Sequence, residues 1–104
     1  MSGPDLTIGR GVIAEMVRLA AFEIPGVARV SRGGPAWRAA VAGSAVETRL
    51  SDEGVRVRVW IIARPGQGLT TLAGDVRTAV AAAVERLLGL RLDSVTVTVD
   101  GVGG

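Results

Sequence analysis

The stretch AAFEIPGVARV, residues 20–30, contains the corner that decides the fold. Small and apolar residues typical of a helix lead up to Glu23, and Pro25 disfavours the helical conformation for the residue before it. Gly26 supplies a turn position, and an alternating pattern typical of a strand begins at Val27. Since the stretch holds a single carboxylate and a single guanidinium, we expect the corner to be architectural rather than catalytic.

Helices are predicted on both sides of this corner. The first runs from about Thr7, an N-cap candidate, to Glu23. Its apolar residues recur at spacings of three and four: Val12, Ile13, Met16, Leu19 and Ala20. The second follows RPGQGLTT (residues 64–71), with Thr70 or Thr71 as its cap, and ends at Gly89. Its predicted buried face consists of Leu72, Val76, Val80, Ala83 and Leu87.

Strands are predicted at residues 27–31, 46–50, 55–63 and 95–99. The second and third form a hairpin across SDEG, a glycine-containing loop of suitable length. Successive side chains of a strand point to opposite faces. The third strand therefore directs Val55, Val57, Val59 and Ile61 to one face and Arg56, Arg58, Trp60 and Ile62 to the other.

This order of elements predicts an α+β two-layer sandwich, with two amphipathic helices on one face of a mostly antiparallel sheet of three to five strands. With 104 residues the chain is expected to form a single domain, 1–104. Its ordered core is predicted to span about 6–102. Residues 32–44 are predicted to be a loop with at most one helical turn around Trp37, and residues 101–104 a frayed tail.

Composition excludes much chemistry. The chain has no Cys, His, Lys or Tyr, so a disulfide, a thiol nucleophile, a Cys/His zinc site and a histidine base are all impossible. Its acidic residues are scattered, and we expect no catalytic residue, no metal and no cofactor. The net charge is only +2, with the two signs interspersed, whereas strong nucleic-acid binders usually show a clustered excess. The opening residues lack a secretion signal, and no apolar run reaches the ~20 residues of a membrane span. We therefore expect a cytoplasmic protein without direct membrane insertion.

The sequence resembles the alkaline shock protein family, also called the envelope stress response family of bacteria. The first matching block ends in Ala20-Ala21 and Glu23-Ile24-Pro25-Gly26-Val27, after apolar matches at Ile8, Val12-Ile13 and Met16. The second block comprises Val76, Val80, Val84 and Leu88-Gly89-Leu90. The third is VTVTVDGV at residues 95–102, and the blocks together cover most of residues 8–102.

The resemblance implies a protein without an active site, abundant in the cytoplasm and tied to envelope and alkaline stress. It also implies self-association and, in some members, attachment to the membrane through a small membrane-anchored partner protein. The sequence departs from the family at Pro65-Gly66, where a Tyr-Gly is common, and at Thr70, where a Pro commonly opens the helix. It also lacks a Lys-rich tail or loop. These differences bear on the identity of the partner more than on the fold.

The candidate interaction surface combines the open sheet face with the predicted loop. Trp60 and Ile62 are large apolar side chains at positions i and i+2 on a face that also carries Arg56 and Arg58. Such a patch is typical of a surface covered by another element or subunit. Trp37 could plug the patch within its own chain or project toward a partner. We expect this surface to mediate self-association and partner docking.

Two alternatives use the same regions of the chain. Arg56, Arg58 and Trp60 could stack single-stranded nucleic acid, although cross-strand pairs with Glu47 would explain the arginines equally well, and we favour protein partners. A weaker anion-site candidate is the loop before the second helix. There Arg64 lies near Gly66 and Gly68, and a helix N-terminus follows at Thr70. An ordinary strand-to-helix loop explains these residues as well.

Overall fold

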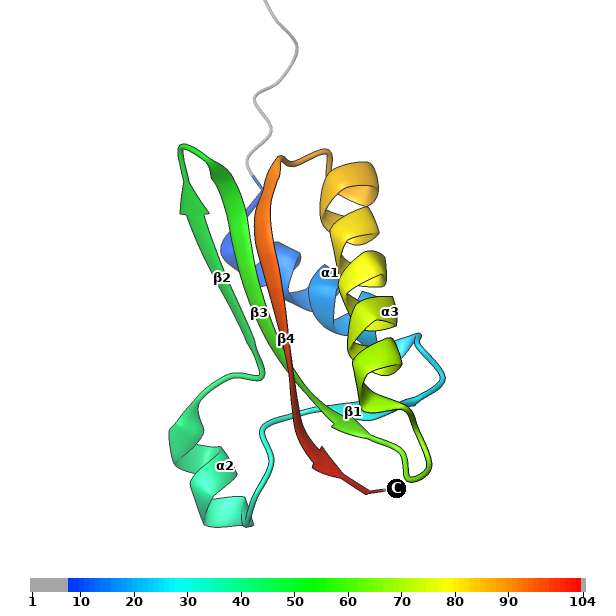
Figure 1. Cartoon of the computed structure of the whole chain (residues 1–104). Coiled ribbons are helices and arrows are strands. Elements are labelled where there is room, and N and C mark those ends of the chain that lie inside the picture. The colour runs from blue at the N-terminus through cyan, green and yellow to red at the C-terminus, as the bar shows by residue number, and fades with distance from the viewer. Residues whose placement is uncertain (1–7, 104) are drawn as a thin grey trace, which may run out of the picture.

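The computed structural model describes residues 8–103 of the chain. Its helices and strands are α1 (Arg10–Phe22), β1 (Val27–Val30), α2 (Ala36–Ala42), β2 (Val46–Ser51), β3 (Gly54–Ala63), α3 (Leu69–Ala82), the π-helix η1 (Ala83–Leu87) and β4 (Leu92–Val102). Helices α1 and α3 cover one face of the four-stranded sheet, and α2 projects from one end of the molecule (Figure 1). The predicted α+β two-layer architecture is confirmed.

Strand β3 is the centre of the sheet. It pairs with β1 and β2 in antiparallel fashion and with β4 in parallel fashion, so two of its three pairings are antiparallel. The parallel pairing arises because α3 and η1 return the chain to the end at which β3 began. Since β4 runs along nearly all of β3, the short β1 and β2 share the opposite edge of β3 end to end.

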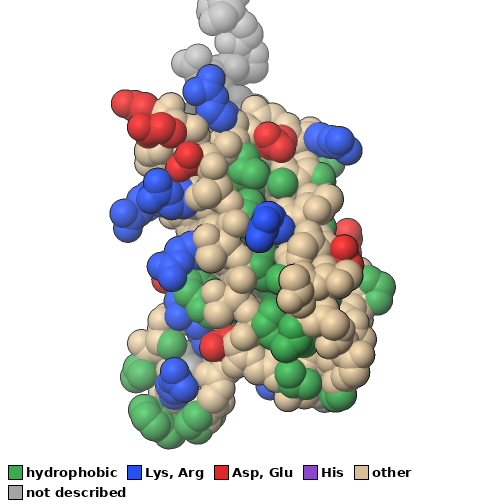
Figure 2. Space-filling view, viewed as in Figure 1, with side chains coloured by type: hydrophobic (Ala, Val, Ile, Leu, Met, Phe, Trp, Pro, Cys, Tyr) green, Lys and Arg blue, Asp and Glu red, His purple; other side chains and the backbone are tan. Residues whose placement is uncertain are grey.

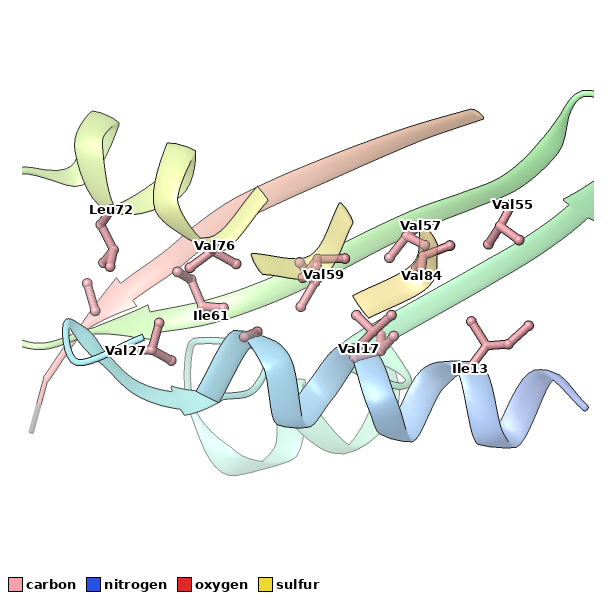
Figure 3. Close-up of a cluster of buried hydrophobic side chains, with 14 residues drawn as sticks. Ile13, Val17, Val27, Val55, Val57, Val59, Ile61, Leu72, Val76 and Val84 are labelled. Carbon is pink, nitrogen blue, oxygen red and sulfur yellow. The ribbon is translucent and has the colours of Figure 1, made fainter. Parts of the chain in front are cut away.

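The core lies between the sheet and the two long helices (Figure 3). The predicted inward face of β3 is confirmed, since its apolar side chains from Val55 to Ile61 are almost completely buried. From the helices they meet Ile13 and Val17 of α1 and Val76 of α3. No aromatic residue belongs to this cluster of buried residues, so the packing is aliphatic throughout.

The corner at residues 23–27 joins the two layers. The backbone N–H of Arg64 donates to the carbonyl of Gly26 at 2.8 Å, and the Arg64 guanidinium donates to the carbonyl of Pro25 at 3.2 Å. A Cβ on Gly26 would lie 2.5 Å from the side-chain oxygen of Gln67 and 2.8 Å from Leu72. A larger residue here would have to displace the ends of the Gln67 and Leu72 side chains, which glycine leaves in place. The corner has the architectural role that the sequence predicted.

The buried face of α1 differs from the prediction. The structure buries Ile13, Val17 and Ala21, whereas Val12 and Leu19 of the predicted stripe are exposed. Apolar residues occupy more than one face of this helix, so spacing alone permits two stripes. The stripe that runs from Ile13 through Val17 to Ala21 faces the sheet, and packing against the sheet selects it over the stripe that contains Val12 and Leu19.

The second long helix also departs from its predicted stripe at one residue. Leu72, Val76, Val80 and Ala83 are buried as predicted, but Leu87 is 70% exposed. The cause is η1, in which the N–H of Leu88 bonds to the carbonyl of Ala83, five residues earlier. This wider turn moves the apolar stripe by one residue, and Leu88 packs against the core in place of Leu87.

Three further expectations are corrected by the structure. Residues 32–44 contain α2, a helix of seven residues, where the sequence predicted a loop with one turn. Gly68 occupies the N-cap of α3, and neither Thr70 nor Thr71 caps it. Strand β4 continues to Val102, which pairs with Ala63, so fraying does not begin at residue 101. The predicted cap at Thr7 lies outside the described residues, and α1 begins at Arg10.

Candidate interaction surface

Helix α2 lies in the segment 32–44, which connects β1 to β2, the two strands that share an edge of β3. We call this connecting segment the α2 excursion. The backbone of Trp60 fixes both ends of this excursion. Its carbonyl accepts a hydrogen bond from the N–H of Ser31 at 3.1 Å, and its own N–H donates to the carbonyl of Ala45 at 2.8 Å. The chain therefore leaves and rejoins the sheet at the same residue, and the segment between must project outward.

The side chain of Arg32 closes the base of the excursion. Its guanidinium lies over the Trp60 ring, with Cζ 3.3 Å from the ring centroid, in a cation–π contact. The same group donates to the carbonyl of Ser44 at 3.0 Å and to the carboxylate of Glu47 at 3.0 Å. One side chain thus joins the start of the excursion, its end and the sheet beneath it.

The sequence left open whether a segment of the same chain or another subunit covers Trp60 and Ile62, and the structure covers both within the chain. This arrangement corrects the expectation that the two side chains are available to a partner on the open sheet face. Trp60 is 7% exposed because Arg32 covers its ring, and Ile62 is 3% exposed. Ile62 packs closely on Gly101 of β4. A Cβ added to Gly101 would lie 3.2 Å from the Cδ1 of Ile62. The covering residue, Arg32, is the first residue of the segment 32–44 that the sequence predicted to be a loop. Sequence reasoning missed it because a cation–π contact leaves no periodic signal.

Trp37 does not plug this patch. It lies on α2 with 70% of its surface exposed, and Val41, one helical turn later, is 77% exposed. Residues at i and i+4 lie on the same side of a helix, so the two side chains form one apolar surface. Figure 2 shows hydrophobic side chains gathered on the lobe that contains α2. We call Trp37 and Val41 the α2 surface.

The two arginines of the candidate face are half exposed and paired with acids. Arg58 lies 3.8 Å from Glu47 across β2 and β3, and its Cζ is 5.1 Å from the Trp60 centroid. Arg56 forms an ion pair with Asp93 at 3.2 Å. Asp93 is the extra residue of β4 at a register shift, since Leu92 pairs with Val55 and Ser94 pairs with Arg56. The residues of the predicted face therefore do not form one surface. Arg56 and Arg58 are exposed in ion pairs, Trp60 and Ile62 are buried, and Trp37 lies separately on α2.

The weaker anion-site candidate lies at the junction of β3 and α3. Its arginine, Arg64, is bonded to the corner at Pro25, as described above. Gly68 lines a shallow cavity of about 430 Å³ beside Gln67 and Asp75, and the carboxylate of Asp75 is unfavourable for an anion. Gly66 adopts a positive φ of 84° in the connecting turn, and Thr70 lies in the first turn of α3.

No group of three or more acidic side chains is placed to hold a metal ion within residues 8–103. None of the helices in the described part of the chain is long and apolar enough to cross a membrane. The clearest pKa shift belongs to the exposed ion pair on α1, where the hydrogen bond from Arg18 lowers the pKa of the Glu15 carboxyl.

Solved structures share this fold. A zinc form of a MamM CTD variant superposes with a TM-score of 0.57 at 20% sequence identity, covering 88% of this chain and 84% of that one. Another MamM CTD variant gives a TM-score of 0.59 at 19% identity, covering 89% of this chain and 98% of that one. At this level of identity the likeness concerns the fold.

Comparison by sequence identifies the family. No curated protein matches the chain. The model of the alkaline shock protein 23 family, described as having a cell envelope-related function, matches residues 3–103. The match agrees with the resemblance carried by the Glu23–Val27 corner and the closing strand. The chain therefore belongs to the alkaline shock protein 23 family, whose function is related to the cell envelope.

Proposed function

We propose that this protein is a non-enzymatic interaction module of the cell-envelope stress response. It associates with further copies of itself and docks from the cytoplasm on a small membrane-anchored partner protein. The observation that carries the proposal is the α2 surface, in which Trp37 and Val41 are exposed on a projecting helix. The family assignment supports the envelope context.

The α2 surface has the features of a protein contact. Tryptophan is enriched among the residues that dominate binding energy, and exposed apolar surface gains free energy when it is covered. The excursion is held at its base by Arg32 and Trp60, so α2 is presented on a braced support. Trp60 and Ile62 are already covered within the chain, so the apolar contact with a partner is made by α2 and not by the sheet face.

Self-association is tested by light scattering over a concentration series, at low and at moderate salt. We expect the molar mass of the wild type to rise with concentration and the rise to persist at moderate salt, since apolar contacts are insensitive to screening. Trp37→Glu should abolish the rise. Leu50→Glu, at another exposed apolar position outside α2, is the matched control. A monomeric wild type at every concentration would exclude self-association.

Docking on a membrane protein is tested by co-sedimentation with native membrane vesicles that expose their cytoplasmic side. The wild type should sediment with intact vesicles, and Trp37→Glu should remain in solution. Vesicles shaved with protease and liposomes of extracted lipids are the two controls, and neither should bind the protein. Equal binding to the lipid-only liposomes would indicate contact with lipid and contradict a protein partner.

A further inference from the structure

A basic cavity lies along the β2 side of the molecule, away from the α2 surface. It measures about 490 Å³ and is lined by Arg10, Glu47, Thr48, Arg49, Arg56 and Arg58. This volume falls within the range of small-molecule sites. The arginines come from three elements, namely the start of α1, strand β2 and strand β3. Figure 2 shows basic side chains along this side of the molecule.

The charge of this cavity is concentrated. Four guanidiniums face a single carboxylate in its lining, which is a larger positive excess than the +2 of the whole chain. The overall composition conceals this excess, because acidic residues elsewhere offset it. A lining of this kind attracts anions, and the guanidinium fork matches the oxygens of phosphate and carboxylate groups.

The strand register places two of these arginines opposite each other. Arg49 on β2 is the direct cross-strand partner of Arg56 on β3. Directly opposed side chains of an antiparallel pair lie close together on one face, and like charges there destabilise the sheet. Asp93 pairs with Arg56, and Glu47 lies 3.8 Å from Arg58, but neither Arg49 nor Arg10 forms an ion pair with another described residue. The fold therefore holds guanidiniums together without enough carboxylates to neutralise them.

We propose that this cavity binds a compact ligand that carries two or more linked phosphate groups. Two neighbouring phosphates would lie between Arg49 and Arg56 and relieve their repulsion, with Arg10 and Arg58 closing on either side. The lining contains no aromatic side chain. Since Arg32 covers the Trp60 ring, no aromatic platform for a nucleobase is available beside the cavity. Recognition thus rests on the phosphates rather than on a base.

The test uses inorganic pyrophosphate as the probe, with calorimetry at low salt and thermal unfolding as readouts. We expect saturable binding of one pyrophosphate per chain, and Arg49→Gln should weaken it by about tenfold or more, the usual effect of losing a charge-assisted hydrogen-bonding group. Arg77→Gln is the matched control, since it removes the same charge from the exposed face of α3. Arg64→Gln tests the weaker anion-site candidate and should also leave binding intact.

A second readout separates a ligand site from an ordinary surface arginine. Without ligand, Arg49→Gln should raise the melting temperature by roughly 1–5 °C, because it removes a like-charge pair from the sheet. A variant that is more stable and binds less tightly is the signature of a site that is strained until its ligand arrives.

Three results would overturn the proposal. The first is the absence of saturable pyrophosphate binding, and the second is an equal loss in Arg49→Gln and Arg77→Gln, which would indicate only net charge. The third is an Arg49-dependent site that prefers single-stranded RNA or citrate to pyrophosphate, which would assign the cavity to nucleic acid or to polycarboxylates.

Discussion

Replacing Arg32 by alanine is the sharpest test of how the α2 excursion is held. The cation–π contact with the largely desolvated Trp60 ring is worth about 1–2 kcal/mol. The hydrogen bond to the Ser44 carbonyl adds about 1 kcal/mol, and the ion pair with Glu47, whose side chain is half exposed, adds less than about 1 kcal/mol. We therefore expect Arg32→Ala to lower the free energy of unfolding by about 2–4 kcal/mol, or the melting temperature by roughly 10–30 °C.

The assay is urea denaturation followed by fluorescence in a Trp37→Phe background, so that Trp60 is the only tryptophan. Besides the loss of stability, the native emission of Trp60 should shift to longer wavelength as its ring becomes hydrated. Arg38→Ala, an exposed arginine of α2, is the control and should cost less than about 0.5 kcal/mol. If Arg32→Ala costs no more than this control, or if the native emission does not move, the proposed bracing is wrong.

Three further predictions concern the core, the hairpin turn and the helix surface. Ile61→Ala should lower the free energy of unfolding by about 3 kcal/mol in urea, because Ile61 is fully buried; a cost equal to that of Val41→Ala, at an exposed site, would contradict this. Gly54→Ala should cost about 1–3 kcal/mol in the same assay, since Gly54 has a φ of 124° and a Cβ would lie 2.6 Å from a backbone oxygen, and a neutral result would refute the turn geometry. The pKa of the Glu15 carboxyl, followed by NMR titration, should lie below its ordinary value and return to it in Arg18→Gln. The pair then stabilises the fold above the unfolded pKa of Glu15 and loses that effect as the pH falls through the folded pKa, so an unchanged pKa in the variant would contradict it.

The corner and the alternation of β3 were readable from the sequence because they depend on neighbours in the chain. Pro25 restricts its predecessor, Gly26 permits a close approach, and alternating valines assign the two faces of a strand whatever packs on them. The existence of α1 and α3 was equally local, whereas α2 lies where the sequence predicted a loop. The buried stripe of α1 could not be read from the sequence, because Val17 and Leu19 are both apolar and only packing against the sheet selects between them.

The candidate surface was only partly predictable for the same reason. Trp37 could be recognised as a lone tryptophan in a segment of turn residues and alanines, and the structure leaves it exposed. That Trp60 is covered depends on Arg32, which is far from it in sequence and reaches the ring only because β1 and β2 share one edge of β3. No spacing rule connects these residues.

By itself the sequence determined the α+β class, the mostly antiparallel sheet, the inward face of β3 and the absence of cysteine and histidine chemistry. These features follow from local conformational preference, from periodicity and from composition, which are properties of short stretches. Only the tertiary structure decided that Trp60 is buried, that α2 projects and that Arg49 on β2 lies opposite Arg56 on the adjacent strand β3. Those features depend on strand register and on contacts between distant segments, which are fixed when the whole core packs and not before.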